Sequence, residues 1–246
     1  MNINFTNFNI ALGDTLLEPK HGDSEPFDVI VSNPPFSTKW EGKDNPLLIN
    51  DERFAPAGVL APSSKADFAF LLHGLSWLSP SGIMAIVMFP GVCYCGGAER
   101  QIRKYLIDNN FIDSVITLPP NLFFGNSISA CIIVLKKNKP DTSVLFINGS
   151  EEYAKATNKN KLSPQNIDNL LKFYTQRADV PFVCKVASYE EIATNDYNLS
   201  PSSYIEAKDT RERVDIKELN AEIKEIVERQ AALRAQIDAI VADLEG

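Results

Sequence analysis

The sequence lacks the features that mark several classes of protein. No apolar run reaches the roughly 18 residues that a membrane-spanning helix needs, so we expect no membrane partner. The chain has only four cysteines and two histidines in 246 residues. Cys93 and Cys95 are too close for a zinc knuckle, and Cys131 and Cys184 form no pair motif, so we expect no metal site. We expect the thiols to be reduced, as they are in a cytoplasm.

An excess of positive charge is also absent. The net charge is −8, which is unusual for a protein that holds DNA phosphates by itself. A set of scattered basic residues could still meet phosphates, although such residues usually form a solvated surface. These residues are Lys39, Lys43, Arg53, Lys65, Arg100, Arg103 and Lys104.

The most distinctive stretch is the tetrapeptide Asn33-Pro34-Pro35-Phe36. The apolar run Phe27–Ser32 in front of it predicts a buried parallel strand, and the two prolines end that strand. In open α/β sheets, ligands bind just beyond the carboxyl ends of the strands. The sequence therefore predicts a reaction site at this tetrapeptide.

The tetrapeptide has the chemistry to hold an amine. The prolines lack N–H groups, so their backbone offers only carbonyl acceptors, and Asn33 adds a side-chain carbonyl. Two fixed acceptors suit a planar –NH2 group, while Phe36 can stack on the ring that carries it. The pattern predicts transfer to an amine nitrogen through positioning and electrostatics. The alternative is a Pro-rich turn with an incidental Asn and Phe.

The surrounding sequence resembles that of a known family. Residues 28–36 are similar to motif IV of amino-group methyltransferases that use S-adenosylmethionine. Residues 49–62 and 66–70 resemble the modification subunit of Type I restriction-modification systems, most closely its type IC branch. The resemblance implies adenine-N6 methylation of DNA on a flipped base, with Asn33, Pro34, Pro35 and Phe36 as catalytic residues. No Pro-Cys pair occurs, which disfavours cytosine-C5 chemistry because that reaction needs a thiolate.

The resemblance covers only the later part of the family's polypeptide. The family's cofactor loop, of the Asp-Pro-x-x-Gly-Ser-Gly type, has no counterpart before Asn33, where the glycines are Gly13 and Gly22. We therefore expect a C-terminal portion of a modification subunit, which alone binds S-adenosylmethionine weakly and is inactive. The resemblance matches Asp14 to the acidic residue that contacts the cofactor's adenine. The alternative role of Asp14 is a turn or helix-cap carboxylate.

The resemblance also implies stacking residues and partners. The stretch around Phe123 and Phe124 corresponds to motif VIII, whose aromatic ring packs on the base opposite Phe36; core packing is the alternative. The implied partners are a specificity subunit, a restriction subunit, a second modification subunit and double-stranded DNA.

The expected fold is α/β: a partial Rossmann-like methyltransferase sheet that lacks its N-terminal strands. The family orders its strands 3-2-1-4-5-7-6, so Phe27–Ser32 is expected to be an exposed edge. We predict the C-terminal part of a catalytic domain at 1–150, an accessory segment at 151–210 and a helix at 211–246. The predicted strands are Asn9–Leu12, Phe27–Ser32, Ile83–Phe89, Phe111–Leu118, Ser129–Lys136 and Val144–Ile147.

Three helices are predicted within this fold. One begins with a capping box of Ser64 and Asp67 and ends before Pro80, and the others are Glu99–Asp108 and Ser163–Gln176. Between the tetrapeptide that follows the strand Phe27–Ser32 and the first helix, residues 37–63 form a long loop, which we expect to be a substrate-facing flap. The stretch Asn195–Ser200 resembles a family motif, and we expect a turn there.

A last helix is predicted from Asp215 to Glu245, with a capping box of Asp215 and Glu218. Its apolar residues repeat every three and four positions, interrupted by Gln230, which predicts a coiled coil about 45 Å long. In the family this region binds helices of the specificity subunit; an intramolecular amphipathic helix is the alternative. The seam consists of Ile216, Leu219, Ile223, Ile226, Gln230, Leu233, Ile237, Ile240 and Leu244.

Two other functions fit the sequence. Amino-methyltransferases that act on RNA or on a protein glutamine also use Asn-Pro-Pro-aromatic stretches, although the long loop and the heptads disfavour them. A non-catalytic assembly module that works through the coiled coil is the second alternative.

Overall fold

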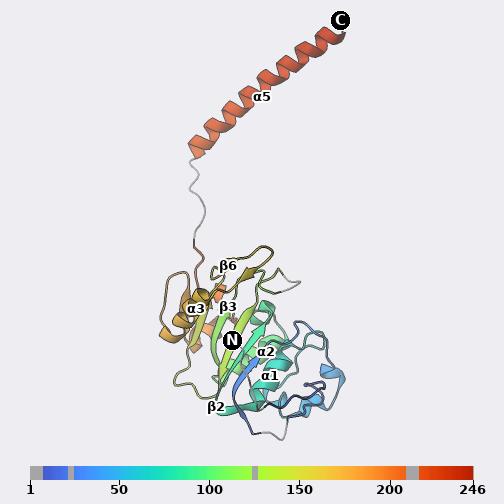
Figure 1. Ribbon diagram of the computed structural model, residues 1–246, viewed down its shortest axis with the longest axis vertical. Helices are drawn as coiled ribbons and strands as arrows, with labels where there is room; N and C mark the ends of the chain where they lie inside the picture. The colour runs from blue at the N-terminus through green and yellow to red at the C-terminus, as the bar shows by residue number, and fades with distance from the viewer. Residues whose placement is uncertain (1–7, 22–24, 124–126, 209–215, 246) are drawn as a thin grey trace. The chain divides into compact units, whose positions relative to one another are not determined.

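The computed structural model describes residues 8–21, 25–123, 127–208 and 216–245 (Figure 1). The chain divides into two compact units, Met1–Ala207 and Lys208–Gly246. The first unit contains both the predicted catalytic part and the predicted accessory segment. The second contains a single helix among its described residues, α5 (Ile216–Glu245), close to the predicted range.

A mixed six-stranded sheet forms the centre of the first unit. Its strand order is β1-β2-β4-β3-β5-β8, with β1 parallel to β2 and β4 antiparallel to both of its neighbours. The first four strands in this order, β1-β2-β4-β3, correspond to the last four of the expected order, 4-5-7-6. Among the described strands, β1 lies at the edge of the sheet. The strands are β1 (Phe27–Ser32), β2 (Leu78–Met88), β3 (Ile112–Thr117), β4 (Cys131–Lys136), β5 (Val144–Asn148) and β8 (Cys184–Ala187).

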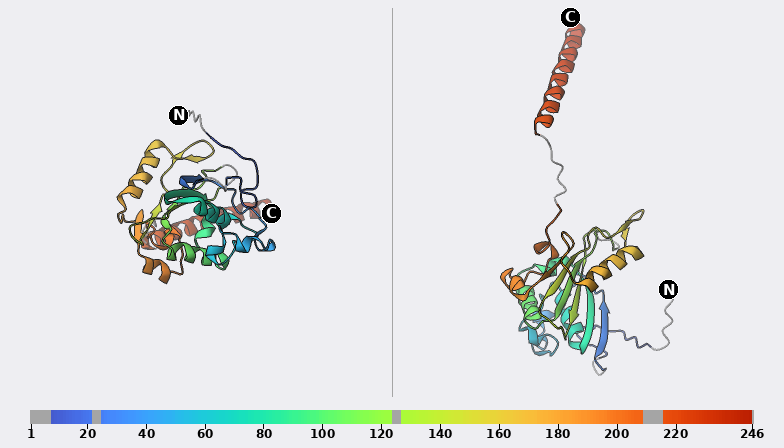
Figure 2. Two further views of the ribbon diagram at one scale, coloured as in Figure 1. Left: turned by 90° about the horizontal axis from the view of Figure 1, so that it is seen from below. Right: turned by 90° about the vertical axis from the view of Figure 1, so that its left-hand side faces the viewer.

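Helices cover the two faces of the sheet unequally. The main core joins the sheet to α1 (Asp67–Trp77), α2 (Ala98–Asp108) and α4 (Tyr189–Thr194). A smaller core joins β3 and β5 to α3 (Pro164–Gln176), which lies on the opposite face (Figure 2). Because α3 covers only that end of the sheet, the apolar face of β1 is open: Val29 is 64% exposed and Val31 is 81% exposed. The prediction of a parallel strand here is confirmed, and the prediction that it is buried is wrong.

Three details differ from the sequence prediction. Residues 9–12 form no strand, and Leu12 is 99% exposed, since no strand among the described residues pairs with them. Helix α1 is capped at Ala66 without a side-chain hydrogen bond, so the predicted Ser64–Asp67 capping box is wrong. Strand β2 begins at Leu78 and not at Ile83, since Leu78 pairs with Phe27 and the register shifts before Ile83 pairs with Val29.

A short hairpin projects beyond the sheet. Its strands are β6 (Ala154–Lys155) and β7 (Asn160–Lys161), and they pair antiparallel (Figure 1). Helix α3 follows it and begins with a capping box of Ser163 and Asn166.

Candidate active site

The tetrapeptide lies at the carboxyl end of β1, as the sequence predicts. The Asn33 side chain is exposed and makes no hydrogen bond with any residue that the structure describes. Phe36 is half-buried. An exposed amide without a protein partner keeps its full capacity to accept hydrogen bonds from a ligand.

A buried carboxylate fixes the turn directly after the tetrapeptide. The backbone N–H of Ser37 donates to both Asp67 oxygens, at 3.3 and 3.2 Å, and Asp67 is 3% exposed. Ser37 has φ 51°, a left-handed conformation that non-glycine residues adopt rarely. Beside this contact, the Ala66 N–H donates to the Thr38 carbonyl at 2.8 Å. The beginning of α1 thus holds the loop that leaves the candidate site.

The long loop after the tetrapeptide is folded. Its aromatic residues pack together: Phe54 is 1% exposed and its ring centroid lies 5.4 Å from that of Trp40. The Trp40 indole N–H donates to the Pro62 carbonyl at 3.0 Å, which ties the two ends of the loop. Short 3-10 helices occupy Gly42–Asp44, Leu48–Asn50 and Ala55–Ala57.

The structure brings two of the three predicted stacking residues together. The ring centroids of Phe36 and Phe123 are 6.2 Å apart, with an angle of 76° between the planes. A base stacked between two rings requires them parallel and about 7 to 8 Å apart, twice an optimal carbon–carbon contact. One ring must therefore turn before a base can lie between them. Phe124, the other predicted residue, lies outside the described residues.

Asp14 lines a cavity near the tetrapeptide. Its carboxylate accepts from the Leu16 and Leu17 N–H groups at 2.9 and 3.1 Å, so the alternative role as a turn carboxylate is present. The same residue borders a cavity of about 470 Å³ that Trp40 and Phe70 also line. The cavity lies between the segment around Asp14 and the chain that follows Phe36, so the structure brings these predicted site regions together.

An arginine of the long loop holds the Asp14 segment in place. Arg53 donates to the Thr15 and Leu16 carbonyls, at 3.2 and 2.6 Å, and forms an ion pair with Asp51 at 2.7 Å. It also contacts His73 Nδ1 at 3.0 Å. Because arginine only donates, Nδ1 is the acceptor, and His73 Nε2–H donates to Thr15 Oγ1 at 3.2 Å. Burial, followed by the charge of Arg53, lowers the pKa of His73 to about 4, so the ring is neutral.

The Asn195–Ser200 stretch supports the turn that follows β2. The buried Arg103 donates to the carbonyls of Tyr197 and Val92, at 2.8 and 2.9 Å. The Leu199 N–H donates to the Cys93 carbonyl at 2.8 Å. The stretch therefore holds the turn 89–95 against α2, a role that its local sequence did not reveal.

Most of the scattered basic residues prove to be engaged within the protein. Five of the seven contact carboxylates or carbonyl oxygens of this chain. They are Arg53, Lys65, Arg100, Arg103 and Lys104, which leaves Lys39 and Lys43 of the original set.

Two findings concern ligands and membranes. Within the described ranges, no group of three or more His, Cys, Asp or Glu residues could hold a metal ion. In the same part of the chain, no helix combines the length and the apolar character needed to cross a bilayer.

A mixed sheet with Asn-Pro-Pro-Phe at the carboxyl end of a parallel strand is the arrangement expected of a methyltransferase. The N-6 DNA methylase family model matches residues 1–213, and the chain belongs to this family. It is 42% identical over 252 residues to the Type I restriction enzyme MpnII methylase subunit of Mycoplasma pneumoniae, covering 99% of this chain and 46% of that protein. It is 34% identical to the MjaVIII methylase subunit of Methanocaldococcus jannaschii, covering 91% and 41% respectively.

A solved structure agrees with these relatives. The type I restriction-modification system methyltransferase subunit from Streptococcus thermophilus superposes with a TM-score of 0.75 at 44% identity, over 78% of this chain and 41% of that one. The EcoKI M protein shares the fold, with a TM-score of 0.59 at 17% identity, over 92% and 53%. The chain spans about half the length of the curated relatives that it matches.

Proposed function

We propose that this chain provides the base-binding half of an adenine-N6 DNA methyltransferase within a Type I restriction-modification complex. The observation that carries the proposal is the unpartnered Asn33 amide at the carboxyl end of β1, with the Phe36 ring beside Phe123. The family match and the names of the similar subunits support the same reaction.

Each residue of the tetrapeptide has a role in this proposal. The Asn33 side-chain carbonyl and the Pro34 carbonyl accept the two hydrogens of the target amine, which directs its lone pair out of the ring plane. The Pro35 ring fixes the backbone so that these acceptors stay in place. Phe36 stacks on the adenine, which has left the duplex because its amine cannot be reached inside it. Phe123 packs against the other side of the base.

The cofactor implied by the family is S-adenosylmethionine, which supplies a methyl group on a sulfonium. The cavity beside Asp14 fits the adenosine part, since it combines a carboxylate with the aromatic side chains of Trp40 and Phe70. Asp14 would accept a hydrogen bond from the nucleoside, and the rings would cover its base. No Gly-rich loop for the remainder of the cofactor occurs before Asn33.

Helix α5 supports assembly with a second protein. Its seam residues are exposed, for example Ile226 at 65% and Ile237 at 59%. In a parallel self-pair, Arg229 at a g position would face Arg234 at an e position of the other copy, and like charges oppose that pairing. We therefore propose a helix of the specificity subunit as the partner of α5. The restriction subunit, a second modification subunit and double-stranded DNA complete the proposed complex.

The test is Asn33→Ala in the complete methyltransferase that contains this chain. Loss of a positioned acceptor should lower methylation at least about a hundredfold, with complex assembly unchanged. Asn50→Ala is the matched control, because Asn50 is also exposed and lies in the adjoining loop. Methyl transfer from labelled S-adenosylmethionine to DNA, RNA and protein measures rate and substrate together. Normal DNA methylation by the Asn33 variant would refute the proposal.

A further inference from the structure

The hairpin that precedes α3 is the most basic short segment near the site. Residues 153–161 include Lys155, Lys159 and Lys161 and no acidic residue, in a chain whose net charge is −8. Lys155 and Lys161 are exposed, and so are the tip residues Ala156 to Asn158. We call residues 154–161 the basic hairpin.

The basic hairpin is attached to the loop that carries Phe123. The Asn160 backbone N–H donates to the Asn121 carbonyl at 3.0 Å, and the Asn160 side-chain amide donates to the Pro120 carbonyl at 2.9 Å. Phe123 follows two residues later and contacts Phe36. The basic hairpin is therefore fixed by its base to the loop that faces the candidate target site.

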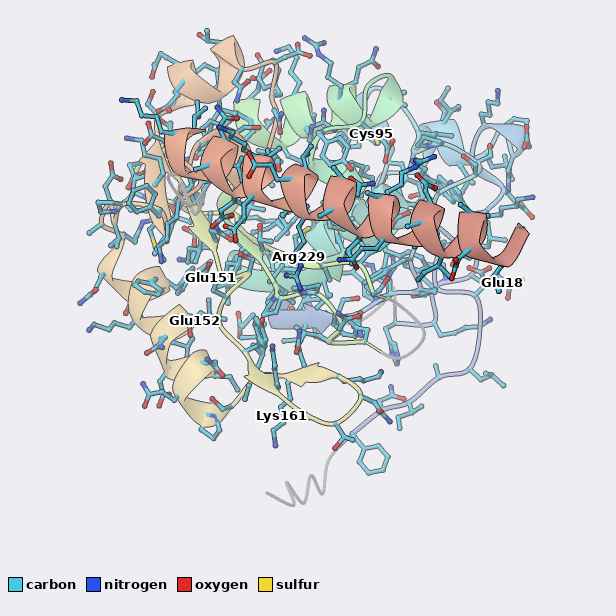
Figure 3. All side chains as sticks on the ribbon, turned by 90° about the horizontal axis from the view of Figure 1, so that it is seen from above. Glu18, Cys95, Glu151, Glu152, Lys161 and Arg229 are labelled. Atoms are coloured by element: carbon cyan, nitrogen blue, oxygen red, sulfur yellow. The ribbon has the colours of Figure 1, made fainter. Side chains whose placement is uncertain are left out.

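The pairing of the hairpin directs its two lysines to opposite sides. Lys155 pairs with Asn160 and Ala154 pairs with Lys161, so Lys155 and Lys161 lie on different faces of the ribbon. The nearest acid before the hairpin, Glu152, accepts from the amides of Asn166 and Asn169 at 3.0 and 3.1 Å. The Glu152 carboxylate therefore binds α3, and Figure 3 shows it apart from Lys161 of the hairpin.

A thin ribbon with an exposed lysine on each face, Lys155 on one and Lys161 on the other, is suited to bind duplex DNA. The major groove is wide enough for a two-stranded ribbon, and a phosphate row borders it on either side. A ribbon with lysines on a single face would reach only one row.

We propose that the basic hairpin enters the major groove next to the target base, where Lys155 and Lys161 contact phosphates of opposite strands. The hairpin thereby adds sequence-independent phosphate contacts that hold the duplex while Asn33 and Phe36 bind the adenine. This inference rests on the proposed function, because it takes DNA as the ligand of the same site.

The experiment measures DNA binding by the complete methyltransferase as a function of salt, for the wild type and for Lys155→Gln/Lys161→Gln. Each lost phosphate contact lowers the slope of log affinity against log salt by about 1, so the double variant should lose about 2. Its affinity should fall about tenfold at low salt, equally for target and non-target DNA. Ethylation of individual phosphates should interfere with wild-type binding on both strands, and the variant should lose that interference.

The control is Lys20→Gln/Lys172→Gln, which removes the same charge from two other exposed positions. It should leave the slope unchanged. An unchanged slope in the Lys155/Lys161 variant would overturn the inference, and so would loss of subunit assembly with normal DNA binding, which would indicate a protein partner. Circular dichroism establishes that the variant is folded.

The outcomes also separate this inference from the proposed function. The Lys155/Lys161 variant should have a lower salt slope and need more DNA for half-maximal methylation, whereas Asn33→Ala should bind DNA with the wild-type salt slope and fail to methylate. If the complete protein methylates DNA and the Lys155/Lys161 variant keeps the wild-type slope of log affinity against log salt, the proposed function stands and the hairpin contact is excluded.

Discussion

Asp67 stands out among single residues because it connects the candidate catalytic loop to the core. It is 3% exposed, and both of its oxygens accept from Ser37, four residues after Asn33. A hydrogen bond to a buried charge contributes more than one between neutral groups. Asp67 therefore stabilises the left-handed Ser37 conformation and holds the chain directly after the tetrapeptide.

Replacing Asp67 should reduce turnover while leaving DNA affinity unchanged. We expect Asp67→Ala to lower kcat about tenfold to a hundredfold, the effect of losing a charge-assisted hydrogen bond of about 1.5 to 3 kcal/mol. Asp67→Asn keeps one acceptor oxygen and should lose less. Steady-state kinetics of the complete methyltransferase measure both variants, with Glu52→Ala at an exposed acidic position of the loop 37–63 as control. Reduced thermal stability with an unchanged kcat would show that Asp67 only supports the fold.

The sequence predicts the residues of the tetrapeptide better than their supports. Asn33 and Phe36 could be identified because a strand, a double proline and an aromatic residue lie together. Asp67 was assigned to a local cap with Ser64, since a contact 30 residues away leaves no local pattern. Arg53 was likewise considered only as a possible phosphate ligand, although in the fold it binds carbonyls of the segment around Asp14.

At the scale of elements, the segment around Asp14 is the clearest departure from prediction. The apolar residues before it predicted a strand at Asn9–Leu12, but these residues form none, and the chain that follows turns at residues 15–17, where Arg53 and His73 hold it. This attachment requires a neutral His73, because Nδ1 must accept from Arg53. Protonation of His73 would place two cations together and remove that acceptor.

The attachment should weaken in acid. The folded pKa of His73 is about 4, below the ordinary value of 6.5, so its contribution is present above pH 6.5 and is lost as the pH falls towards 4. Between about pH 7 and about pH 5 the wild type should lose about 2 kcal/mol more stability than His73→Gln. Urea unfolding at both pH values measures this difference. His21→Gln is the matched control and should behave as the wild type; equal losses in the wild type and His73→Gln would contradict the prediction.

At the scale of the whole molecule, the sheet has a free edge at β1 among the described strands. Among the described strands, β1 pairs only with β2, and its apolar face carries the exposed residues Val29 and Val31. An edge with unpaired N–H and C=O groups and an apolar face is a template for further pairing. The order of the first four strands was predictable from the family, whereas β8 was not, because four residues give too weak a pattern.

The isolated chain should therefore associate with itself or with another strand. We expect light scattering after size-exclusion chromatography to show species larger than a monomer, because the β1 edge remains open. A chain ending at Ala207 is the control: it keeps β1 and lacks α5, so it should associate in the same way. A stable monomer of the full chain would contradict the prediction, and a monomer of the shortened chain alone would assign the association to α5.

The open edge has a consequence for when the site can act. Asn33 directly follows a strand that is braced on one side only, so its position is set by β2 and by the Asp67 contact. Any strand that pairs with the free side of β1 would stiffen the peptide that carries the amide. If the proposed function holds, the accuracy with which Asn33 is positioned would depend on whether that additional strand is paired with β1.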